Sequence, residues 1–402
     1  MAKSTFSFRY YTGAIASSNF AVGVQTVVFP WLIIGLLNLS PSQLGLAQMA
    51  LLLPNLLFIL PGGVVADGRH RSSWLAILYA LYMLPIGFLL AAIITESLSF
   101  AVMLVFAAVF GTISAFVQPA RESLLGYTDP KVMHQAVAKV VSIQFVAQSL
   151  GFLLAGQMDT IGLVTLLSIQ LLMFFFSALF IRRSHPVLAG DEMPVKSRQL
   201  AQELVEGFGL FRDNTALLHL VFIVFATGFL AFGVYLVGMP IIAREGYSAG
   251  VELYATFQII FTLGIVTANL GVMRRDRMFA RPGRLMIISF LWRGSLVAIV
   301  AFLPSLWILF PVIFVWGFFS GLSITLGRTI LHSQVDQSLR SRAASVYQLC
   351  LFSGAPLGAW VCGLAIERVG LSTTFIAIAL VTLAVSVLAA LVSPLWHLQD
   401  TK

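Results

Sequence analysis

Charged residues are scarce in this chain: Asp, Glu, Lys and Arg make up 10% of its 402 residues. A water-soluble domain carries about a quarter, so a soluble fold of this length would lack the groups to cover its surface. Cysteine is also rare. The two residues, Cys350 and Cys362, lie twelve apart in one apolar stretch, a spacing that fits neither a metal site nor a redox pair.

Motifs for common membrane-associated chemistry are missing as well. A P-loop needs a Gly-Lys pair within G-x4-G-K-[ST], and the sequence contains no such pair, which argues against ATP-driven transport by this chain alone. No spacing indicates a metal site, a cofactor site or a nucleophile with its base. We therefore expect neither an enzyme nor a cofactor.

Apolar residues dominate instead: 59% of the chain is hydrophobic, with 33 Phe. Because a spanning helix needs about 20 mostly apolar residues, the continuous runs predict an all-α membrane protein that lies in a lipid bilayer. The expected spans are twelve: 11–37, 43–65, 74–94, 98–119, 137–157, 161–181, 216–241, 251–272, 285–303, 306–327, 344–366 and 371–393.

Basic residues alternate between the loops. The even-numbered loops carry almost all of them, whereas the odd-numbered loops hold only Arg244 and Arg368. The positive-inside rule then predicts cytoplasmic termini in a multi-pass protein of the cell inner membrane. The net charge of +8 is explained by this topology, because no stretch is long enough to build a basic groove for nucleic acid.

The two halves of the sequence repeat one another at an offset near 207–210. The pattern A-x-G-V-x5-P occurs at Ala21–Pro30 and again at Ala231–Pro240. Glycines in the fifth and eleventh spans also correspond: Gly151 with Gly358, and Gly156 with Gly363. We predict two pseudo-symmetric six-helix bundles, 1–182 and 215–402, joined by a cytoplasmic linker over 183–214. Pro30 and Pro240 are expected to bend gating helices.

The loop after the second span carries a family signature. Gly63, Asp67 and Arg71 resemble the G-x3-D-basic loop of the major facilitator superfamily, although Gly68 and His70 depart from its usual tail. The segment 116–121, Phe-Val-Gln-Pro-Ala-Arg, resembles the bacterial drug and siderophore exporter (enterobactin-exporter-like) branch. The resemblance implies that Asp67 latches onto the N-terminus of the eleventh span, near 341–345. It also implies a monomer.

Polar residues within apolar spans are candidates for lining a substrate cavity, because lipid disfavours them. The resemblance implies that spans one, four, seven and ten line the cavity. Gln144 and Gln148, four apart, share a helix face. The alternative for each candidate is an interhelical hydrogen bond without a substrate role. The candidate substrate-binding residues are Asn19, Gln25, Gln118, Gln144, Gln148, Tyr235 and Gln258.

Arginines near the cytoplasmic ends of the spans form a second group. Arg121 and Arg328 correspond in the repeat and are predicted to gate the site, with Glu122 beside the first of them. They could instead attract an anionic group through the forked guanidinium. Arg293 falls within the ninth span, where it could help to bind an anion or could snorkel to the cytoplasmic interface.

The sequence favours a secondary transporter that exports a small amphipathic, drug- or siderophore-like molecule by alternating access. Proton coupling follows only from the resemblance, because no acidic residue lies in the middle of a span. A proton antiporter and a uniporter therefore both stay open. Other readings are a transporter or flippase of a lipid-like or other organic anion and, from a different class, a non-transporting membrane sensor.

Overall fold

The computed structural model describes residues 6–67, 71–125, 128, 133–184, 209–212, 214–274, 281–335 and 339–398, and contains only helices within these ranges. The description also leaves out the side chains of residues 59–67, 71, 123, 133–134, 340–342 and 345. Eleven helices of the described part are long and apolar enough to cross a membrane. The predicted second span corresponds to a further 27-residue helix, α2 (Pro41–Asp67). The all-α membrane fold is confirmed.

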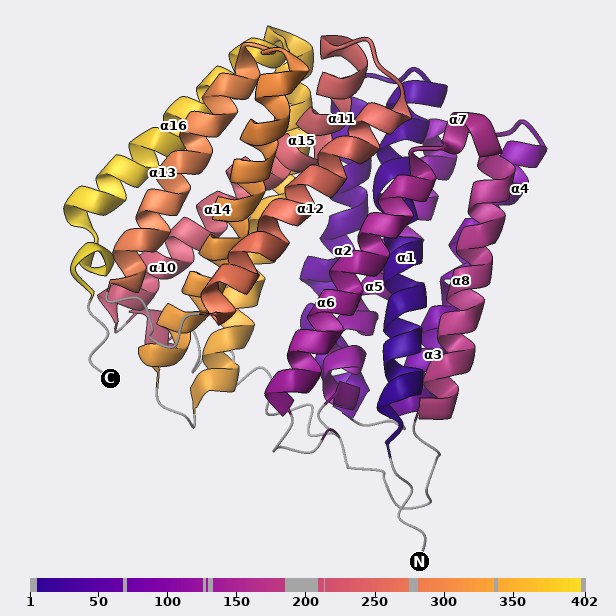
Figure 1. Ribbon diagram of the computed structural model, residues 1–402, viewed down its shortest axis with the longest axis horizontal. Coiled ribbons are helices and arrows are strands. Elements are labelled where there is room, and N and C mark those ends of the chain that lie inside the picture. The colour runs from indigo at the N-terminus through magenta and orange to yellow at the C-terminus, as the bar shows by residue number, and fades with distance from the viewer. Residues whose placement is uncertain are drawn as a thin grey trace, which may run out of the picture. The chain divides into compact units, whose positions relative to one another are not determined.

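The helices divide between two compact units (Figure 1). Unit 1 comprises Met1–Leu39, Ala50–Ser197 and Ala249–Thr256, and unit 2 comprises Ser40–Met49, Arg198–Ser248 and Phe257–Lys402. Two helices, α2 and α12 (Val251–Met273), therefore pass from one unit to the other. The predicted boundaries of the two bundles stay a prediction, and most of the predicted linker 183–214 is outside the described residues.

Unit 1 is built around its first helix. The elements of this unit are α1 (Phe8–Trp31), η1 (Leu32–Leu36), α3 (Arg71–Leu81), α4 (Met83–Ile94), α5 (Phe100–Leu125), α6 (Met133–Ala155), α7 (Met158–Ile161) and α8 (Leu163–Ser184), together with most of α2. Figure 1 shows α1 beside α8, and α1 packs against both α6 and α8. Gly23 and Gly151 permit the α1–α6 crossing, since a Cβ at either would collide with a backbone carbonyl of the other helix.

Unit 2 repeats this arrangement with other helices. Its elements are α10 (Thr215–Ala226), η3 (Thr227–Ala231), η4 (Val234–Gly238), α11 (Met239–Ile241), η5 (Ile242–Gly246), α13 (Pro282–Ala301), α14 (Leu306–Ser333), α15 (Arg340–Val369), α16 (Leu371–Val392) and η7 (Pro394–His397). Gly233 and Gly358 permit the corresponding crossing with α15. The repeated glycines predicted from the sequence thus mark equivalent helix crossings in both units.

The first helix of unit 2 is less regular than that of unit 1. Its π-helical turn η5 has a counterpart in η1, 210 residues earlier (242 − 32). The turns η3 and η4 are additional. A π turn widens the helix and often occurs at functional sites. The seventh span has two π turns that the first span lacks, although the two sequences correspond in this region.

Candidate functional site

Arg121 organises a polar cluster at the end of α5. Its Nη2 donates to Oε1 of Gln144 on α6 at 3.1 Å, and its backbone carbonyl accepts from the Tyr11 hydroxyl at 3.1 Å. These bonds connect α5 to α6 and to α1. The predicted gating arginine is therefore joined to a predicted substrate-binding glutamine within unit 1.

Gln118 and Glu122 form a second pair on α5. The Gln118 amide donates to Oε1 of Glu122 at 2.6 Å, and both side chains are exposed. Gln148, one turn beyond Gln144 on α6, is half-buried. These three residues lie on α5 and α6, the two helices that the Arg121–Gln144 hydrogen bond connects, and their predicted roles stay predictions.

A deeper pair joins α1 to α8. Gln170, fully buried, donates to Oε1 of Gln25 at 2.9 Å and to the Ala21 carbonyl at 3.1 Å. Within the described part of the chain, Nε2 of Gln25 and Oε1 of Gln170 have no hydrogen-bond partner. Sequence reasoning missed Gln170, although a lone glutamine inside the predicted sixth span carries the same signal as the glutamines it identified.

Asn19 is bonded differently from the other candidates. Its amide donates to the Ile15 carbonyl one turn earlier at 2.8 Å, and the side chain is buried. This bond satisfies the amide within α1 itself. The predicted substrate role of Asn19 stays a prediction.

Tyr235 and Gln258 meet in unit 2. The Gln258 side chain hydrogen-bonds the Tyr235 hydroxyl, and the Tyr235 ring packs on Phe261 with 4.6 Å between centroids. Gln258 is fully buried. The pair thus combines an aromatic surface with hydrogen-bonding groups inside unit 2.

Four residues before each of the two repeated prolines, a backbone carbonyl accepts a hydrogen bond from another helix. Pro30 has no N–H to offer the Thr26 carbonyl, which accepts from the Tyr254 hydroxyl of α12 at 3.3 Å within unit 1. The Leu236 carbonyl, four residues before Pro240 in the π-helical turn η4, accepts from the Gln48 amide of α2 at 3.3 Å within unit 2. Thr26 and Leu236 correspond at the offset of 210 (236 − 26), so the arrangement is repeated.

Three predicted gating residues lie in the stretch around the end of α2 and the start of α3. The side chains of Gly63, Asp67 and Arg71 lie outside the description, as does much of the predicted partner segment 341–345. The helix α15 does begin at Arg340, close to the predicted place. Arg328 is exposed on α14, and its gating role stays a prediction.

Arg293 does not snorkel. Only 3% of its surface is exposed, and its Nη2 donates to Oγ1 of Thr227 at 2.9 Å inside unit 2. That part of the expectation is wrong because Thr227 and the ring of Phe290 hold the guanidinium in the interior of the unit.

Acidic residues stand near the ends of the described spans. Of the acidic residues in the described spans, Glu122, Glu245, Glu252 and Glu367 each lie within two residues of a span end. Within the described ranges, no group of three His, Cys, Asp or Glu side chains is placed to hold a metal ion. Amides, phenols and aromatic rings can hold an amphipathic molecule through hydrogen bonds and apolar contact.

Comparison with known proteins identifies a family and a relative that this chain resembles. A family model described as transmembrane secretion effector (MFS_3) matches residues 3–401. The multidrug efflux pump Tap of Mycolicibacterium fortuitum is 25% identical over 385 residues, which cover 91% of each chain.

Solved transporter structures share the fold at low sequence identity. An auto-inhibited POT family peptide transporter superposes with a TM-score of 0.75 at 13% identity, covering 98% of each chain. The human organic anion transporter MFSD10 gives 0.67 at 14% identity over 95% of this chain and 98% of its own. Because the family model spans nearly the whole sequence and these folds agree, this chain belongs to the transmembrane secretion effector family of the major facilitator superfamily.

Proposed function

We propose that this chain is a secondary transporter that exports a small amphipathic molecule from the cytoplasm. The observation that carries the proposal is the likeness to a multidrug efflux pump over 91% of both chains. The polar groups supplement it, since the buried amides of Gln25 and Gln258 and the half-buried phenol of Tyr235 lie among apolar side chains. The positive-inside pattern supports a cytoplasmic location for both termini.

Alternating access gives a role to the two helices that pass between units. Residues 40–49 of α2 pack with unit 2, where Gly363 and Gly45 bring α15 and α2 into backbone contact. Residues 249–256 of α12 pack with unit 1, where Ala255 meets Gly156. Each of these two helices thus packs partly with one unit and partly with the other.

Purified protein in liposomes tests the proposal. Fluorescent cationic, neutral and anionic amphipathic compounds are offered with and without an imposed pH gradient, and transport is compared with protein-free liposomes. We expect cationic or neutral compounds to cross in a protein-dependent manner. If a gradient does not alter the rate, proton antiport is excluded and a uniporter remains. If no compound class crosses, the export proposal is wrong and a sensor is favoured.

A matched pair of tyrosine variants locates the site. Tyr235→Phe removes the hydroxyl bonded to Gln258, and we expect KM to rise roughly fivefold, the equivalent of one hydrogen bond of about 1 kcal/mol. Tyr247→Phe removes a hydroxyl that donates to the Pro304 carbonyl, outside the predicted site, and should leave KM unchanged. Equal effects of both variants would argue against a substrate role for Tyr235.

An organic or lipid-like anion is the second candidate substrate. It is favoured by Arg328, which is exposed on α14, and by Arg121, whose guanidinium is bonded to a neutral glutamine. Arg121→Ala and Arg328→Ala should then abolish transport of anionic compounds and spare neutral ones. Equal loss for both compound classes would instead indicate a gating role.

A further inference from the structure

The end of unit 2 at which α13 begins carries exposed positive charge. Arg281 precedes the helix, Arg284 lies in its first turn, and both side chains are exposed. The acidic side chains described in unit 2 are Glu245 and Glu367. Whether either carboxylate can neutralise these arginines depends on where the helices place it.

Both carboxylates lie a helix length away from the two arginines. The start of α13 packs against η7, which follows α16, whereas Glu367 precedes α16. The 22 residues of α16 extend about 33 Å. The helix η7 also contacts α10, and Glu245 follows the end of α10 by 19 residues (245 − 226). Among the described residues, Arg281 and Arg284 therefore have no counter-charge.

A tryptophan holds one of these guanidinium groups at the surface. Leu395 of η7 is fully buried, and its carbonyl lies where a Cβ on Gly283 would be, which fixes η7 against α13. The ring of the next residue, Trp396, is half-buried and lies 4.9 Å from the central carbon of the Arg284 guanidinium. This contact uses the face of the ring and none of the guanidinium N–H groups. Those N–H groups can donate two parallel hydrogen bonds to a phosphate.

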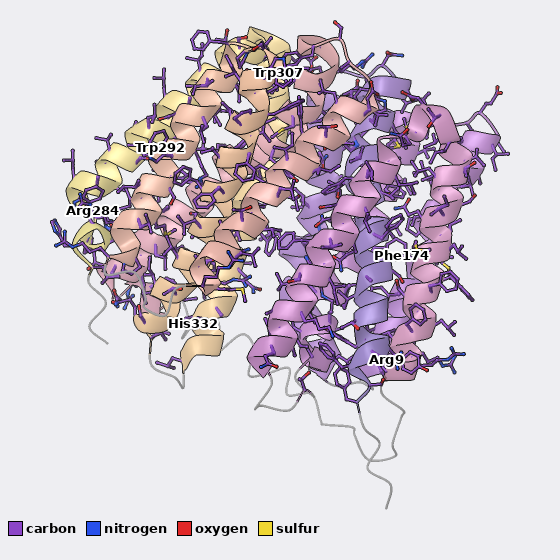
Figure 2. The ribbon with its side chains drawn as sticks, in the orientation of Figure 1. Arg9, Phe174, Arg284, Trp292, Trp307 and His332 are labelled. Atoms are coloured by element: carbon purple, nitrogen blue, oxygen red, sulfur yellow. The ribbon has the colours of Figure 1, made fainter. Side chains whose placement is uncertain are left out.

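An apolar surface continues from this pair along α13. Ile288, Trp292 and Ile299 follow Arg284 at 4, 8 and 15 residues, so they share its face of the helix. Trp292 is 48% exposed, and Figure 2 shows it along the same edge of unit 2 as Arg284. The neighbouring helix α16 ends in exposed apolar residues as well, among them Leu391. A charged end above an apolar surface matches the form of a phospholipid, with its phosphate above its acyl chains.

We propose that Arg281, Arg284 and Trp396 bind the headgroup of an anionic phospholipid, whose acyl chains lie along the exposed faces of α13 and α16. Two positive charges favour a lipid with net negative charge over a zwitterionic one, whose amine they repel. Tryptophan favours the membrane interface, where phospholipid phosphates lie. The positive-inside rule predicts this end of the unit to be cytoplasmic. The site is on the exposed surface of unit 2, and it does not depend on the substrate that we propose for the transporter.

Thermal unfolding of the full-length protein in a neutral detergent tests the site. Melting temperatures are measured with phosphatidylglycerol, with phosphatidylcholine of the same acyl chains, and with inorganic phosphate alone. We expect phosphatidylglycerol to raise the melting temperature by about 2–4 °C over phosphatidylcholine, because a ligand of the folded state stabilises it. Equal values for the two lipids would overturn the proposal. An equal rise with inorganic phosphate alone would assign the site to a free anion and would overturn it as well.

Two arginine variants provide the comparison. Arg284→Gln removes the guanidinium beside Trp396 and should abolish most of the difference between the two lipids. Arg182→Gln removes an exposed arginine from the last turn of α8 in unit 1, and should retain that difference. The readout is the difference between lipids within each variant, so a general change in stability does not affect it. A difference that persists in Arg284→Gln, or that falls equally in both variants, would refute the site.

A measurement on the unaltered protein covers the case in which Arg284→Gln does not fold. Phosphatidylglycerol with a photoreactive group in its headgroup should crosslink mainly to peptides that contain residues 281–285 or 394–398. Crosslinks spread evenly over the basic ends of the other helices would contradict the proposal, whatever the variants show.

Discussion

Gln25 and Gln170 form a polar contact in the core of unit 1 that leaves part of each amide unused. Gln170 donates to Gln25, while Nε2 of Gln25 and Oε1 of Gln170 lack partners among the described residues. A buried amide group without a partner costs about 1–3 kcal/mol. Proteins tolerate such a cost where a ligand forms hydrogen bonds with the unpaired groups. Variants of this pair can therefore test whether the substrate binds there.

A double-mutant cycle separates packing from binding at this pair. Gln170→Leu leaves the Gln25 carbonyl unpaired and should lower the free energy of unfolding by about 1–3 kcal/mol. Adding Gln25→Leu should recover most of that loss, since two apolar partners fit one another. Transport in liposomes should not recover, because the amide that we assign to the substrate is gone. Stability is measured by thermal unfolding.

The control for this cycle is Ser168→Ala, an exposed position on the same helix whose hydroxyl donates to the Val164 carbonyl. It should change neither stability nor transport appreciably. If transport returned together with stability in the double variant, Gln25 would be a structural residue, and its place in the substrate site would be lost.

The sequence identified single polar residues but not their partners. Gln25 and Gln170 are 145 positions apart, and no pattern in one chain reports that they meet. The same applies to Arg293, because periodicity cannot distinguish a side chain facing the bundle from one reaching the interface. Which groups lie inside the spans was predictable from composition, whereas their pairing depends on helix packing.

At the scale of elements, the repeated prolines lie one turn after carbonyls that other helices contact. A side chain from α12 donates to the Thr26 carbonyl and one from α2 donates to the Leu236 carbonyl. A single side-chain hydrogen bond restrains the backbone less than a continuous helix does, since a typical hydrogen bond contributes about 1 kcal/mol to stability. In the alternating access that we propose, we expect these two contacts to break and reform as α1 and the seventh span move.

Hydrogen–deuterium exchange tests the two contacts. Tyr254→Phe should raise the exchange of amides around Thr26, and Gln48→Leu should do so around Leu236, each by roughly fivefold for a loss of about 1 kcal/mol. The matched control is Thr256→Val, since the Thr256 hydroxyl donates within its own helix to Glu252. Exchange that matches the unaltered protein in both variants would show that the contacts carry no restraint.

Helix existence and repetition were predictable, and helix irregularity was not. Apolar runs predicted the spans, and repeated glycines and prolines predicted their equivalent crossings, because these features are visible in the sequence itself. The additional turns η3 and η4 have no such mark. They depend on how α15 and α13 pack against the seventh span, through contacts such as Gly228 with Leu351 and Arg293 with Thr227.

For the whole molecule, the distribution of charge should determine how the chain lies in the membrane. Basic residues cluster in the even-numbered loops of the sequence, and an exposed tryptophan, Trp307, stands 89% accessible near the start of α14 (Figure 2). Tryptophan favours the membrane interface. The helix α14 therefore offers a direct test of orientation, because both of its ends carry an exposed serine.

Cysteine labelling at the two ends of α14 checks the predicted topology. Ser305 precedes the helix and Ser333 ends it, and both are exposed. In a chain with Cys350 and Cys362 replaced by alanine, a membrane-impermeant maleimide should label Ser305→Cys in right-side-out vesicles. It should label Ser333→Cys only after permeabilisation, since the positive-inside rule places that end in the cytoplasm. The reverse pattern would invert every loop, and export would then have to be argued from the opposite face.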